Sequence, residues 1–206
     1  MARLINFISN HRLALLLLVL LSCVVPAIFL PRLSVDNSIE VWLRRGSPEY
    51  QRYRAFLDRY GSEEFVVIAA QMDDPLSADS LGLQRDLAQR LEKIEGVDRV
   101  LDLPRLTRAI WAGTPGWEGY ARQSDFLHNL LLSPDGKTMG MFVQLDELAG
   151  PTARRKTVEA IEQAVDTIAE GQWEPHLAGT PLMNASLDVA SERAAMTFLP
   201  LAVGIS

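Results

Sequence analysis

The 206-residue chain has a single cysteine, Cys23, so no disulfide can form within it. It also lacks the short motifs of common catalytic sites, with no G-x-x-x-x-G-K-[ST] phosphate loop and no G-x-S-x-G turn. Its three histidines, His11, His128 and His176, are too scattered to form a metal-binding pattern. We therefore expect no enzymatic activity, no cofactor and no metal site.

Positive charge is sparse and dispersed along the chain. The chain has 26 acidic and 20 basic residues, and its net charge is −6. Residues 31–193 contain all 26 acidic residues but only 18 of the basic ones, which gives this part a net charge of −8. Such a surface does not suit nucleic acid, and no run of Lys and Arg indicates binding to anionic lipid headgroups.

Charge is absent altogether from two segments near the chain ends. Residues 13–30 are an uncharged run that would form a helix of about 27 Å, long enough to span a bilayer. Arg3, His11 and Arg12 precede it, which places the N-terminus in the cytoplasm by the positive-inside rule. Residues 194–206 are also uncharged, and we expect them to begin a second span that Ser206 cuts short, as in the front part of a larger membrane protein.

The predicted organisation follows from these two segments. Residues 1–12 are a cytoplasmic N-terminus, 13–30 the first transmembrane helix, 31–193 a periplasmic domain and 194–206 the start of the second transmembrane helix. Two other interpretations of the first segment remain open. It resembles a cleaved signal peptide, but it is longer than the usual apolar core and has no clear A-x-A site. It also resembles a lipoprotein signal ending at Cys23, but seven apolar residues follow that cysteine.

The domain between the two spans shows alternating helix and strand patterns. A helix is expected from Ser47 as N-cap to Gly61, with Tyr53, Phe56, Leu57 and Tyr60 packed in the core. A second is expected from Ser77 to Glu95. A third begins at Pro151 and ends at Gly171, with one buried face. That face contains Val158, Ile161, Val165 and Ile168.

Strands are expected between these helices. They are residues 65–71, 97–103, 127–132, 139–145 and an edge strand over 173–178. Asp135-Gly136 predicts a hairpin turn, and Thr180-Pro181 begins a helix that continues into the second span. Without the extra hairpin strand, the order is β-α-β followed by β-α-β. This order predicts an α+β, ferredoxin-like domain with helices on one face of a mostly antiparallel sheet.

The segment from Pro104 to Asp125 is predicted to be a glycine-rich loop. It contains Trp111, Trp117 and Tyr120 among four residues that favour turns. Aromatic side chains on such a loop can hold an apolar ligand, so these three are the candidate substrate-binding residues. The competing interpretation is that the rings only anchor the loop to the domain.

Several stretches resemble the N-terminal part of resistance–nodulation–division (RND) exporters, and most closely their MMPL-type branch of lipid exporters. They are Asp36 to Leu43 (DNSIEVWL), Tyr50 to Ala69 (YQRYRAFLDRYGSEEFVVIA), Gly96 to Val100 (GVDRV) and Ala178 to Asn184 (AGTPLMN). No single stretch is diagnostic, but their order and spacing are similar throughout the chain.

The resemblance implies a proton-driven exporter of lipids or other hydrophobic molecules in a bacterial inner membrane. Its partners would be the bilayer and a lipid-like substrate, and a homo-oligomeric or periplasmic protein partner stays open. Residues 31–193 would be the porter domain that guides substrate. Neither predicted span contains Asp or Glu, so no proton-coupling residue is assigned. The alternative function is a membrane-anchored periplasmic interaction module without transport activity.

Overall fold

The computed structural model describes residues 11–13, 39–148, 150–169 and 173–205. The chain divides into two units, Asp36–Asp188 and a second unit composed of Met1–Val35 and Val189–Ser206. The predicted first span, 13–30, lies almost wholly outside the described residues. In the described ranges, no helix has both the length and the apolar stretch needed to cross a membrane. The membrane spans therefore stay predictions.

A four-stranded antiparallel sheet is the centre of the Asp36–Asp188 unit. Its strands are β1 (Phe65–Gln71), β2 (Val97–Leu101), β3 (Thr138–Leu145) and β4 (Pro175–Ala178), in the spatial order β2-β3-β1-β4. Every neighbouring pair is antiparallel. Because β3 lies between β1 and β2, and β1 between β3 and β4, both β-α-β units are split by a strand of the other. The predicted α+β class, antiparallel sheet and edge position of the last strand are confirmed.

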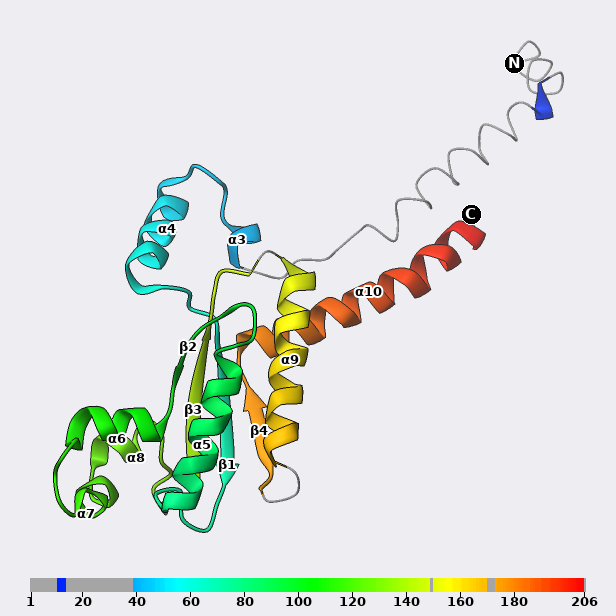
Figure 1. Ribbon diagram of the computed structural model, residues 1–206. Helices are drawn as coiled ribbons and strands as arrows, with labels where there is room; N and C mark the ends of the chain where they lie inside the picture. Colours follow the sequence, from blue (N-terminus) through cyan, green and yellow to red (C-terminus); the bar gives the residue numbers. More distant parts are fainter. Residues whose placement is uncertain (1–10, 14–38, 149, 170–172, 206) are drawn as a thin grey trace. The chain divides into compact units, whose positions relative to one another are not determined.

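Two long helices cover one face of this sheet (Figure 1). They are α5 (Ala78–Leu91), which connects β1 to β2, and α9 (Pro151–Ala169), which connects β3 to β4. The strand β1 is apolar up to its last residue, Gln71, but its side chains alternate between buried and more exposed positions, so only one face enters the core. Ile161 and Val165 of α9 are fully buried, as the helical spacing predicts.

The segment predicted as a loop is instead helical. It forms α6 (Leu103–Trp111), α7 (Trp117–Arg122) and α8 (Asp125–His128), which gather beside the end of β2 (Figure 1). The predicted strand over 127–132 is also wrong, since only an isolated bridge joins Leu132 to Met139. The Asp-Gly turn is present, because the Gly136 N–H donates to the Ser133 carbonyl at 2.9 Å with Gly136 at φ 70°.

The helix α4 (Pro48–Tyr60) has the predicted ends but not the predicted packing. Ser47 caps it by accepting a hydrogen bond from the Tyr50 N–H, and Gly61 follows its last residue. No residue of α4 is buried, and the aromatic side chains of Phe56 and Tyr60 are 44% and 60% exposed. The predicted core stripe is therefore wrong. The two rings instead contact each other on the surface, with centroids 5.1 Å apart.

Two backbone segments lie unusually close together where the chain leaves the sheet. Gly179 lies between β4 and α10 (Thr180–Ile205) at φ 143°, and a Cβ at this position would come within 2.1 Å of the Phe65 carbonyl oxygen. Only glycine allows β1 and the start of α10 to approach this closely. The short helix α3 (Ile39–Trp42) precedes α4 and completes the described helices.

Candidate functional site: a pocket between α5 and α6

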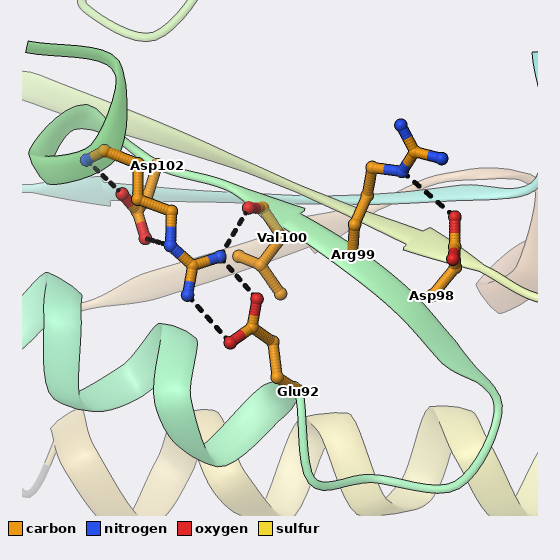
Figure 2. Close-up of polar contacts among 6 residues, drawn as sticks. Glu92, Asp98, Arg99, Val100 and Asp102 are labelled. Atoms are coloured by element: carbon orange, nitrogen blue, oxygen red, sulfur yellow. Dashed lines mark hydrogen bonds and ion pairs between the residues drawn. The ribbon is translucent and has the colours of Figure 1, made fainter. Parts of the chain in front are cut away.

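The position of α6 is fixed by a buried aspartate at its N-terminus. Asp102 is 1% exposed, and its Oδ1 accepts a hydrogen bond from the Arg105 N–H at 2.7 Å, which caps the helix. The Arg105 guanidinium donates to both carboxylate oxygens of Glu92, at the end of α5, and to the Val100 carbonyl of β2 at 2.8 Å. Figure 2 shows Glu92, Val100 and Asp102 around this guanidinium. Three elements, α5, β2 and α6, are thereby joined.

The electrostatics of this junction reflect its burial. Removal from water raises the pKa of the Asp102 carboxyl above its usual value, while the Arg105 N–H and the charges of Arg105 and Arg85 act in the opposite direction. The hydrogen bond that Arg105 donates to the Glu92 carboxylate raises the pKa of Arg105, so the guanidinium stays charged. The exposed pair Asp98–Arg99 nearby has a nitrogen–oxygen distance of 3.0 Å and adds little to stability.

A pocket of about 220 Å³ lies beside this junction, between α5, α6 and the start of α7. Its buried part is formed by Leu81, Pro104 and Thr107. Its outer part is formed by Arg85, Arg108, Trp111, Trp117 and the Ala112-Gly113 backbone. We call it the tryptophan pocket. The Thr107 hydroxyl already donates to the Leu103 carbonyl at 2.7 Å, so the buried part is essentially apolar.

Two of the three predicted binding residues line this pocket. Trp111 and Trp117 are half-buried and pack against the core with part of each ring, which leaves the rest facing the pocket. Tyr120 is not among the lining residues, and its side chain is 59% exposed on α7. The fold therefore brings the two tryptophans together and separates the tyrosine from them.

The arginines of the pocket were not predicted from the sequence. Arg85 and Arg108 are exposed at the pocket mouth, one from α5 and one from α6. Within the described part of the chain, neither guanidinium forms an ion pair with a carboxylate, unlike Arg105 and Arg122. A helical interpretation of 103–111 would have found Arg108, because Pro104, Thr107, Arg108 and Trp111 follow the i, i+3, i+4, i+7 spacing of one helix face.

The short helices α7 and α8 are held against the domain by polar contacts. The Arg122 guanidinium donates to Asp74 at 2.6 Å, and this contact lowers the pKa of the Asp74 carboxyl. The ring of His128 contacts two carbonyl oxygens, through Nδ1 to Ser133 at 2.7 Å and through Nε2 to Arg122 at 3.0 Å. These two bonds raise the pKa of His128, because carbonyls only accept and the doubly protonated ring satisfies both.

A second buried polar cluster joins α9 to α10. The Arg154 side chain is 2% exposed, and its Nη1 donates to Oδ2 of Asp188 at 3.0 Å. Its Nε lies 3.6 Å from Oε1 of Glu64, just before β1. None of these three residues lines the tryptophan pocket, and we assign the cluster a structural role. In the described ranges, no group of three His, Cys, Asp or Glu side chains could hold a metal ion.

Comparison with known proteins supplies one match. The sequence pattern of the MMPL family matches residues 50–205, which is most of the chain. It includes the sheet, the helices α5 to α9 and the whole tryptophan pocket. A search of curated proteins finds no match to the chain.

Proposed function

The chain belongs to the MMPL family, and on that premise we propose that it is part of a membrane exporter of the RND type, driven by protons, which moves lipids or other hydrophobic molecules. The sheet domain would lie in the periplasm and guide substrate, and it would have no enzymatic activity of its own. The observation that supports this most directly is the tryptophan pocket. Its partly apolar lining is presented on the surface by a rigid sheet domain, and this arrangement suits an apolar ligand.

The size of the pocket limits what it holds. Pockets that enclose a whole drug-sized ligand usually measure about 300–1,000 Å³, whereas this one measures about 220 Å³. It therefore suits one end of a lipid-like molecule, with the remainder outside. In an exporter, such a site would receive the end of a substrate on its route and would release it again without enclosing it.

The test is export of amphiphiles by the full-length protein in cells. Both tryptophans pack partly on the core, so Trp111→Leu plus Trp117→Leu is preferred to alanine, because leucine retains apolar volume. We expect export to fall about tenfold while the protein remains folded and inserted. The matched control is Trp42→Leu, since Trp42 is 82% exposed and lies outside the pocket. Unchanged export by the folded double variant would remove the pocket from the substrate route.

A second candidate function is the membrane-anchored interaction module. The observation that favours it is an apolar surface on α6, α7 and α8, where three large side chains are about half exposed: Ile110, Tyr120 and Phe126. The two functions differ in their dependence on the proton gradient. An uncoupler should abolish export if the protein is a proton-driven exporter, whereas cells with and without the protein would retain equal amounts of substrate if it only binds a partner.

A further inference from the structure

We propose that the tryptophan pocket selects amphiphiles with an anionic headgroup, a carboxylate or a phosphate, through Arg85 and Arg108. This inference rests on the proposed function only in taking the pocket as the place where the substrate binds. In the sequence, neither Arg85 nor Arg108 belongs to a run of basic residues. The fold creates one, by placing two arginines that are 23 positions apart at the mouth of the same pocket.

The chemistry of the pocket is divided between its two parts. Leu81 and Pro104 are buried and supply an apolar surface, to which the rings of Trp111 and Trp117 add flat apolar faces. The only hydroxyl in the buried part, that of Thr107, donates within its own helix. An uncharged polar headgroup would find no free donor there, so an apolar chain suits this part.

The outer part is cationic. Other arginines of this region have acidic partners, Glu92 for Arg105 and Asp74 for Arg122, and these partners hold their guanidinium groups in place. Among the residues that the structure describes, Arg85 and Arg108 form no such ion pair. The Asp102 carboxylate, on which the charge of Arg85 acts, already accepts from the Arg105 N–H and pairs with its guanidinium.

A guanidinium group binds a carboxylate or phosphate through two parallel N–H donors, and such charge-assisted bonds are stronger than neutral ones. The domain carries a net negative charge and therefore repels anions over long distances. Arg85 and Arg108 have no ion pair among the described residues, so the potential at the mouth of the pocket is locally positive. An anion with an attached apolar chain satisfies both parts of the pocket, whereas a free anion or an uncharged amphiphile satisfies only one.

The test measures binding to the 206-residue chain in nanodiscs of phosphatidylcholine, by tryptophan fluorescence in a Trp42→Phe background. Three probes separate the contributions: octyl phosphate, 1-octanol and inorganic phosphate. We expect octyl phosphate to bind at least tenfold more tightly than either of the others, and this preference to shrink between about 50 mM and 300 mM salt because exposed charges are screened. Equal binding of octyl phosphate and octanol would overturn the inference, and so would equal binding of octyl phosphate and inorganic phosphate.

Variants then show which residues cause the preference for octyl phosphate. Arg85→Gln plus Arg108→Gln should lower octyl phosphate affinity about tenfold and leave octanol binding unchanged. The lysine pair at the same positions should retain most of the preference. Arg90→Gln plus Lys93→Gln removes the same charge from the end of α5, outside the pocket, and should change little. A preference that survives in the folded glutamine variant contradicts the proposal. If that variant unfolds, Arg108→Gln alone supplies the same comparison, because Arg108 is exposed on its helix.

The export test and the binding test have independent outcomes, so each proposal can fail without the other. If the tryptophan variants abolish export but the wild-type chain shows no preference for octyl phosphate, the proposed function stands and the anionic selectivity is wrong. If the preference is present and depends on the arginines while export is unaffected by the tryptophan variants, the selectivity stands and the pocket has a role other than export.

Discussion

At the scale of single residues, His128 shows how one side chain can make a local structure sensitive to pH. Its two ring nitrogens both face carbonyl oxygens, from α7 on one side and from the turn before β3 on the other. Neutral imidazole has one N–H and leaves one of these contacts unsatisfied, whereas the imidazolium donates to both. Asp125, one turn earlier in α8, adds a favourable charge. The folded state therefore raises the pKa of His128.

The sign of the pH dependence follows from this direction. A pKa that is higher in the folded state than in the unfolded state stabilises the protein fully below the unfolded value of about 6.5. The contribution is then lost as pH rises through the folded value. We expect the difference in melting temperature between wild type and His128→Gln to be largest near pH 5.5 and to shrink by pH 8.5. A difference that is constant over this range would show that the proton on His128 does not contribute.

At the scale of elements, the sequence predicts helix N-caps better than helix C-termini or packing faces, since α5 ends at Leu91 and not at the expected Glu95. Ser47 and Ser77 were identified as N-caps, and both accept hydrogen bonds from the N–H groups of the first turn. The buried face of α9 was also predicted, because apolar and charged residues alternate clearly along it. The aromatic spacing of α4 is equally regular, yet the helix buries none of its residues. Spacing shows that residues share a face, but only tertiary contacts decide what covers that face.

The same limit explains the error at residues 104–125. Glycine and proline recur along this segment, and this pattern is typical of a continuous loop. In the structure, Pro104 lies in the first turn of α6, where proline is tolerated, and Gly113 and Gly116 adopt positive φ between α6 and α7. Most of the segment's turn-forming residues lie at the ends of these short helices or in the connections between them. Trp111 and Trp117, two of the three candidate binding residues, line the tryptophan pocket, whereas Arg108 can be expected there only if the segment is taken as a helix.

The buried cluster around Arg154 supports a prediction about how α9 holds α10. Arg154→Met would remove the guanidinium that pairs with the carboxylate of Asp188, which is 4% exposed. Breaking a buried pair in this way typically costs about 3–5 kcal/mol of unfolding free energy. Adding Asp188→Leu should recover most of this loss, because the double variant buries no unpaired charge at that position. Urea unfolding of the four species, combined as a double-mutant cycle, measures the coupling.

The neighbouring arginine provides the control for this cycle. Arg155 is only partly buried, and its pair with Glu159 has a nitrogen–oxygen distance of 4.0 Å. Arg155→Met removes the same charge from the same helix and should change stability by no more than about 0.5 kcal/mol. A cost for Arg155→Met equal to that for Arg154→Met would assign the effect to the net charge of α9 instead of to the buried cluster.

At the scale of the whole molecule, the order of the four sheet strands and of the two helices that cover them is predictable from the sequence, and the site is not. The alternation of strand and helix patterns determines a split β-α-β topology because few arrangements of such units bury both helices on one sheet face. The tryptophan pocket depends on relations that no short window of sequence contains. Leu81 and Arg85 come from one helix, and Trp111 and Trp117 follow about 30 residues later. The Glu92–Arg105 contact joins the end of α5 to α6.

The arrangement of the chain across the membrane is the last prediction at this scale. Arg3 and Arg12 precede the uncharged segment 13–30, and the acidic residues all follow it, so we expect the sheet domain outside the cytoplasm. The single cysteine makes labelling direct, because Cys23→Ser gives a background without thiols. In that background, Lys137→Cys places a thiol on the exposed turn before β3, and Asn6→Cys places one ahead of the first span. An impermeant thiol reagent should label the first variant in intact spheroplasts and the second only after lysis. Labelling of Asn6→Cys alone in intact cells would invert the topology, and the pocket would then face the cytoplasm, where it could not act on a substrate outside the membrane.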